Sequence, residues 1–75
     1  MKHVWVIKVT FSNKTVNLNE AYTSYDKAKY AILRKIDECD RKYLSDYRFY
    51  DIQNEIEYEL KLVDIIDWRG DKYEL

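Results

Sequence analysis

The chain has few of the residues from which disulfides, metal sites and phosphate-binding loops are built. Cys39 is the only cysteine and His3 the only histidine among its 75 residues, which excludes an intrachain disulfide and a zinc site of four His and Cys ligands. Gly70 is the only glycine and proline is absent, so no glycine-rich phosphate loop is present. No Ser-His-Asp set is recognisable. We expect a protein that is not an enzyme and uses no cofactor.

Long apolar runs are also missing. None approaches the roughly 18 residues typical of a membrane-spanning helix, and no signal-peptide core is present. With a lone thiol, this predicts a cytoplasmic protein without membrane contact. The length predicts a single domain over residues 1–75, with a frayed tail at 70–75. Because so small a domain has a marginal core and eight tyrosines offer contact area, we expect a homodimer.

Charge is divided unevenly along the chain, although the formal net charge is only −1. Residues 1–50 carry a net charge of +4, and residues 51–75 carry a net charge of −5. We expect a molecule with a charge dipole, provided that folding keeps these segments on different faces.

Alternating apolar residues predict a β-hairpin at the start of the chain. Residues 2–11 are rich in β-branched and aromatic side chains, and a turn around Asn13 leads into a return strand at 15–19. Val16 and Leu18 of the return strand are expected to face the core.

Apolar residues spaced three and four apart predict a helix over residues 24–44. Thr23 is the expected N-cap, with Asp26 three residues later. The stripe includes Ile32, Ile36 and Cys39, so Cys39 is expected to be an inert core residue.

Residues 45–66 allow two interpretations. Ile52, Ile56, Leu60 and Val63 have helical spacing, but strict alternation from 55 to 62 favours two strands joined by a turn at 53–55. The predicted fold class is therefore α+β, of the form ββαβ(β), with one helix packed on an antiparallel sheet of three to four strands. The expected core residues are Trp5, Ile7, Val9, Ile32, Ile36, Ile56, Tyr58 and Leu60.

Two segments, Tyr22–Ala28 within "AYTSYDKAKYAI" and Ile56–Leu62 with the sequence "IEYELKL", resemble small uncharacterised phage and prophage proteins of low-GC bacteria. The resemblance covers about half of the chain and departs from the pattern at Tyr43–Tyr50. It implies a phage setting and a ββαβ-type fold, and it implies no catalytic residue. Many such proteins bind and disable host machinery.

A row of carboxylates in the C-terminal third is the main functional lead. On a strand, alternate residues lie about 6.7 Å apart and point to one face, so the row can imitate a phosphate backbone and meet a nucleic-acid-handling host protein. Metal binding by Glu55, Glu57 and Glu59 is a weaker alternative, because residues at this spacing are too far apart to share one ion easily. A solvated strand face remains the alternative, because Lys61 interrupts the row. The expected protein-binding residues are Asp51, Glu55, Glu57, Glu59, Asp64 and Asp67, with Tyr47 and Tyr50 as anchors.

Direct nucleic-acid binding is the competing hypothesis. A basic stripe on the predicted helix would supply phosphate contacts, but nearby acidic residues interrupt it. The pI near 5.8 is also well below the values typical of nucleic-acid-binding domains. Its members are Lys27, Arg34, Lys35, Arg41 and Lys42.

Overall fold

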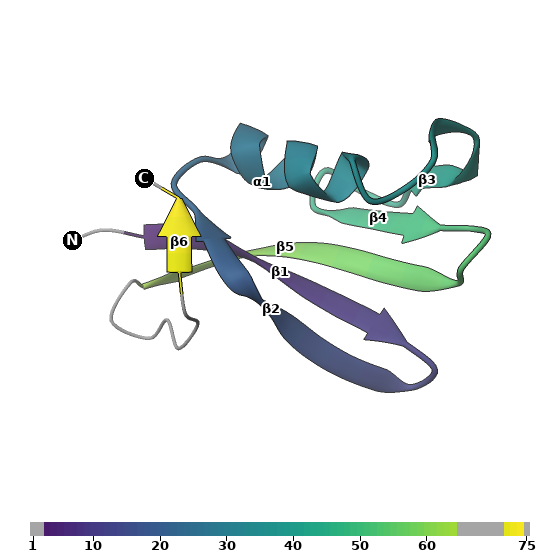
Figure 1. Cartoon of the computed structure of the whole chain (residues 1–75), viewed down its shortest axis with the longest axis horizontal. Helices are drawn as coiled ribbons and strands as arrows, with labels where there is room; N and C mark the ends of the chain where they lie inside the picture. The colour runs from purple at the N-terminus through teal and green to yellow at the C-terminus, as the bar shows by residue number, and fades with distance from the viewer. Residues whose placement is uncertain (1–2, 65–71, 75) are drawn as a thin grey trace.

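The computed structural model describes residues 3–64 and 72–74 of the chain. Six strands form one sheet in the order β3-β4-β5-β1-β2-β6, and one helix lies on it (Figure 1). Along the chain, the elements are β1 (His3–Phe11), β2 (Lys14–Tyr22), α1 (Tyr25–Leu33), the 3₁₀ turn η1 (Glu38–Asp40), β3 (Arg41–Tyr43), β4 (Arg48–Asp51), β5 (Ile56–Asp64) and β6 (Lys72–Glu74).

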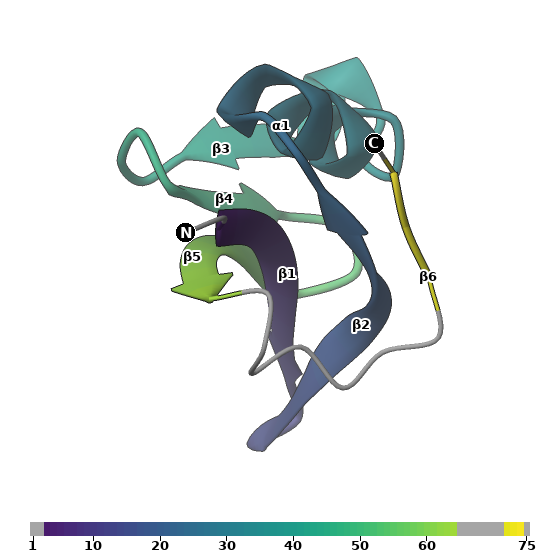
Figure 2. The ribbon, with the colours of Figure 1, turned by 90° about the vertical axis from the view of Figure 1, so that its left-hand side faces the viewer.

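The α+β class is confirmed, but the predicted number of strands was too low. Strands β1 to β5 are joined by antiparallel pairing alone, and β6 adds to β2 in parallel. Part of the tail that was expected to fray therefore forms β6, while residues 70, 71 and 75 lie outside the described part of the chain. Helix α1 lies within the curve of the sheet (Figure 2).

Both hairpins predicted from the alternation are present. Ser12 and Asn13 have φ angles of 49° and 64°, the two positive values of a type I′ turn. The backbone twist of such a turn matches the right-handed twist of the strands that flank it, here β1 and β2. Strands β4 and β5 form the second hairpin, and Ile56–Asp64 is a strand, so the helical interpretation of this segment is wrong.

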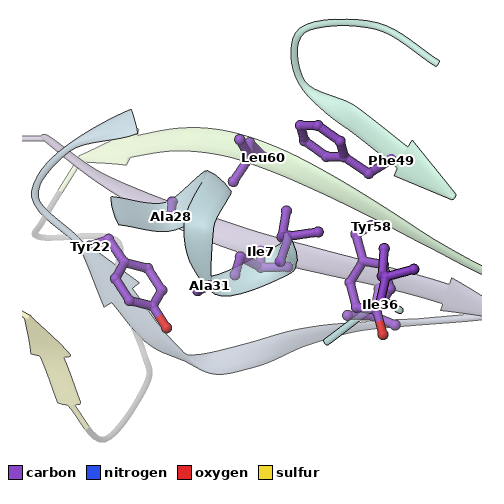
Figure 3. Close-up of a cluster of buried hydrophobic side chains, with 10 residues drawn as sticks. Ile7, Tyr22, Ala28, Ala31, Ile36, Phe49, Tyr58 and Leu60 are labelled. Atoms are coloured by element: carbon purple, nitrogen blue, oxygen red, sulfur yellow. The ribbon is translucent and has the colours of Figure 1, made fainter. Parts of the chain in front are cut away.

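The main core lies between α1 and one face of the sheet, here called the helix face (Figure 3). Six of the eight expected core residues are buried there, and Trp5 and Ile56 are partly buried against them. The buried members are Ile7, Val9, Tyr22, Ala28, Ala31, Ile32, Ile36, Phe49, Tyr58 and Leu60. On the opposite face, Val4, Val6 and Ala21 form a smaller buried cluster.

Helix α1 is much shorter than the predicted helix over 24–44. It begins one residue later than expected, because the N-cap is Ser24, whose hydroxyl accepts a hydrogen bond of 3.1 Å from the Lys27 N–H. It ends at Leu33. Continuing the helix would place the carboxylates of Asp37, Glu38 and Asp40 near its negative end, where they are unfavourable.

The guanidinium of Arg41 closes the end of α1. Its Nη2 donates to the Leu33 carbonyl at 2.7 Å and its Nε donates to the Ile36 carbonyl at 3.1 Å. The last carbonyls of a helix have no partner within the helix, so Arg41 supplies a donor to Leu33, the last residue of α1, and also fixes Ile36 just beyond it. The chain then enters η1, and Cys39 is exposed there rather than buried in the core as expected.

The short helix covers only part of the helix face. Nine helical residues span about 13.5 Å, whereas the nine-residue strand β1 spans roughly 30 Å. The hairpin end of β1 and β2 extends away from α1 (Figure 1). As a result, Phe11 is 41% exposed, and Val16, which was expected to face the core, is 47% exposed.

Replacing Ile36 by alanine should lower the free energy of unfolding by about 2–5 kcal/mol, because Ile36 is 2% exposed and its loss leaves a cavity. Ile52→Ala is the matched control, since Ile52 is 51% exposed and its truncation should change stability by less than about 0.5 kcal/mol. Urea unfolding of the two variants measures both values. Equal losses would contradict the placement of Ile36 in the core.

Candidate functional site

The glutamates of β5 that were expected to form an acidic row are paired with cations. Glu57 Oε2 lies 2.7 Å from Arg48 Nη2 and also accepts from Arg48 Nε at 2.8 Å. Glu59 Oε1 lies 3.1 Å from Lys8 Nζ. Both pairs lie on the sheet face opposite α1, and each links β5 to a neighbouring strand. Exposed pairs of this kind contribute little stability, but they cancel local charge.

That opposite face is not acidic across strands β3, β4, β5 and β1. The strand register places two carboxylates there, Glu57 and Glu59, among four cations, namely Lys8, Lys42, Arg48 and Lys61. A partner that approaches these strands meets mixed charge rather than a regular array of anions. Imitation of a phosphate backbone therefore stays a prediction, and the charges on these strands do not favour it.

Asp51 does not belong to the acidic row, because it is 2% exposed. Its Oδ1 accepts from the Asn54 N–H at 3.2 Å, and its Oδ2 accepts from Asn54 Nδ2 at 2.8 Å. Such bonds close a turn, so Asp51 holds the connection between β4 and β5. Glu55 is exposed in that connection and has a φ of 56°.

The remaining residues of the predicted protein-binding set are scattered. Asp64 lies opposite His3, with Oδ1 and Nε2 separated by 2.8 Å, at the far end of β5 from the Asp51 turn. Tyr50 is partly buried. On the face opposite α1, it lies between its strand neighbours Lys42 of β3 and Glu57 of β5. Asp67 lies outside the described residues. The structure therefore does not bring these residues into one surface.

The basic stripe is also divided, because it needed a helix that continues past Leu33. Lys27 is in the first turn of α1, and Arg34 is its C-cap. Lys35 follows the helix, the Arg41 guanidinium donates to the carbonyls of Leu33 and Ile36, and Lys42 lies on β3. These five side chains cannot contact phosphates along one helical line.

A cluster that the sequence analysis did not assemble lies on the helix face near the start of α1. The rings of Trp5 and Tyr47 are stacked, with centroids 6.0 Å apart and an interplanar angle of 9°. Tyr25 meets both rings edge-on, at centroid distances of 5.5 Å and 5.6 Å. Leu62 lies directly opposite Trp5 on β5, and Lys29 Nζ lies 5.9 Å from the Tyr25 centroid. We call Trp5, Tyr25, Tyr47 and Leu62 the Tyr47 surface.

Hydrogen bonds also hold the backbone of Tyr47 in place. Its carbonyl accepts the Leu60 N–H at 2.8 Å, and its own N–H donates to Ser45 Oγ at 3.2 Å. The hydroxyl of Tyr25 donates to the carbonyl of Asp46, next to Tyr47. Even so, Tyr47 is 49% exposed and Leu62 is 51% exposed. The Tyr47 surface is thus ordered and accessible.

The Tyr47 surface could not be recognised from the sequence as a whole. Tyr47 was expected to be an anchor, but beside the acidic row rather than on the helix face. Trp5 and Leu62 are far apart in the chain and were assigned, respectively, to the core and to the alternating pattern. Only the pairing of β1 with β5 brings them together.

Other kinds of site find no support in the described residues. Among residues 3–64 and 72–74, no group of three His, Cys, Asp or Glu side chains is placed to hold a metal ion. The helix of this part of the chain is too short to cross a membrane. Comparisons with protein-family models, curated proteins and solved structures found no match to this chain.

One buried tyrosine near the Asp51 turn has an altered acidity. Burial raises the pKa of the Tyr58 hydroxyl above its usual value near 10, and the negative charge of Asp51 raises the same pKa further. Tyr58 then keeps its proton in the folded state at a pH where the unfolded chain loses it. The stability that the folded chain gains from keeping Tyr58 neutral and buried is fully present below about pH 10. The free energy of unfolding then falls as the pH rises through the folded-state pKa of Tyr58.

Replacing Tyr58 by phenylalanine should therefore reduce the loss of stability above pH 10. The free energy of unfolding, followed from neutral pH into this alkaline range, should fall less steeply in Tyr58→Phe than in the unmodified chain. Tyr30→Phe is the control, because Tyr30 is 62% exposed. A Tyr58→Phe profile that matches the unmodified chain would contradict the proposed proton linkage.

Proposed function

We propose that this protein is a non-enzymatic protein-binding module and that its partner docks on the Tyr47 surface. The observation that carries the proposal is a half-exposed tyrosine whose ring and backbone are both held in place. Aromatic side chains dominate binding energy at protein interfaces, because they provide a large contact area with few rotatable bonds. An ordered anchor also costs less entropy when the partner binds.

The surroundings of Tyr47 suit the centre of an interface. Leu62 extends the apolar area, and the cation of Lys29 and the His3–Asp64 pair lie on the polar margin. An apolar centre with a polar margin is the usual arrangement at specific protein interfaces. The expected partner therefore inserts an apolar or aromatic side chain between Tyr47 and Leu62.

The resemblance to phage proteins is the sole basis for proposing who the partner is. On that basis, we propose a host protein of the cytoplasm whose action is inhibited or modulated by binding. A contact through Glu57 and Glu59 with a nucleic-acid-handling protein remains a prediction with less electrostatic support, because both glutamates already have cationic partners.

Replacing Tyr47 by alanine should weaken partner binding about 30-fold, which corresponds to roughly 2 kcal/mol for a central aromatic anchor. A photo-crosslinking amino acid at position 62 would identify the partner, and titration calorimetry with the purified partner would measure the affinity. Tyr30→Ala is the matched control, since Tyr30 is an exposed tyrosine on α1 outside the Tyr47 surface. It should leave the affinity unchanged.

Three results would contradict the proposal. Tyr47→Ala and Tyr30→Ala could have equal effects on affinity. The partner could be lost only in the double variant Glu57→Lys/Glu59→Lys, which would favour the acidic contact. Tight binding of DNA or RNA that falls steeply with salt would instead favour the nucleic-acid hypothesis. Circular dichroism of each variant separates lost contacts from lost folding.

A further inference from the structure

The outer edge of β2 is a second surface, distinct from the Tyr47 surface. Within the described residues, β6 pairs only with Glu20–Tyr22, at the end of β2 nearest α1. The segment Lys14–Asn17 pairs with β1 on its inner side, and the described residues place no strand on its outer side. This segment ends at the irregularity where Ile7 faces residues 18–20.

The type I′ turn determines which backbone groups of β2 face outward. In a two-residue hairpin, the residues that flank the turn form a hydrogen-bonded pair, here Phe11 and Lys14, and hydrogen-bonded pairs then alternate along the ladder. Val16 therefore bonds Val9 within the hairpin. Thr15 and Asn17 direct their N–H and carbonyl groups to the outer edge.

The two edges of the sheet are protected to different degrees. The opposite edge, β3, has only three residues and carries Arg41 and Lys42, and short charged edges resist further pairing. From Thr15 to Leu18, β2 has no charged residue and no proline. Phe11 and Val16 add exposed apolar area beside this edge, beyond the reach of α1.

We propose that two copies of this chain associate by antiparallel pairing of their β2 edges, with Val16 facing Val16 of the second copy. In this register, Thr15 of each copy faces Asn17 of the other, so the outward groups of both residues are satisfied in two hydrogen-bonded pairs. If the second copy shifts by two residues in either direction, either Thr15 or Asn17 loses its partner in the regular pairing. Residues that face each other across such a pair point to the same side, so the helix faces of the two copies continue each other.

The charges also permit this register. Lys14 faces Leu18 of the second copy. The two Lys14 residues are then four residues apart along the strands and one strand apart across them, a separation of about 14 Å. That separation exceeds the Debye length of about 8 Å at physiological salt, so their repulsion is screened. A register that places Lys14 against its own copy is disfavoured.

Cysteine substitution tests the register directly. Val16→Cys in a Cys39→Ser background, which removes the exposed native thiol, should form an intermolecular disulfide quickly in a glutathione redox buffer. The two α-carbons of a central non-hydrogen-bonded pair are about 4.5 Å apart, within disulfide reach. Thr15→Cys and Asn17→Cys are matched controls on the same exposed strand. Each lies about 8 Å from its copy, beyond disulfide reach, and should cross-link much more slowly.

Sedimentation equilibrium of the unmodified chain measures the association itself. The mass should rise with concentration from 9.2 kDa towards twice that value. Val16→Lys should raise the dissociation constant by at least about tenfold, because it places like charges opposite each other. Since Val16 is half-exposed, the variant should keep the circular dichroism of the folded chain.

The proposal is wrong if the chain remains monomeric at all concentrations. It is also wrong if the three cysteine variants cross-link at equal rates, or if a dimer persists unchanged in Val16→Lys. A persistent dimer would show that the copies meet through another surface.

Discussion

The contact between the Arg41 guanidinium and the carbonyls of Leu33 and Ile36 is the constraint on which the rest of the molecule depends. A helix end that is buried against a sheet needs donors for its last carbonyls. Arg41 supplies them from β3, so the end of the helix and the start of the next strand are joined by one side chain. The chain can then return to form β3, β4 and β5 instead of continuing away as a longer helix.

Both ends of the helix face carry accessible apolar or aromatic side chains. Near the start of α1, the Trp5 and Tyr47 rings stack beside Leu62. At the hairpin end, Phe11 and Val16 extend beyond the reach of α1. A helix of the predicted length would have had enough reach to cover the hairpin end. The early end of α1 therefore accounts for the exposed apolar residues at the hairpin end, beside the proposed β2 association.

Several charged residues that suggested function have structural partners instead. Asp51 closes a turn through Asn54, Arg41 ends α1, and Glu57 is paired with Arg48. Sequence spacing shows that these charges recur at regular intervals, but it does not show which opposite charge or backbone group they face. That depends on strand neighbours, and β4 reaches β1 only through β5.

The local pattern of the sequence by itself determined the α+β class, the hairpin of β1 and β2, the strand character of Ile56–Asp64 and most of the core. Each of these depends on the alternation of neighbouring residues and on turn chemistry, which are local properties. The end of α1, the exposure of Cys39 and the assembly of the Tyr47 surface were decided only by the tertiary structure. They arise from contacts between residues that are not neighbours in the chain, such as Arg41 with Leu33 and Trp5 with Leu62. The spacing of nearby residues does not show which of these contacts form or how much they stabilise the fold.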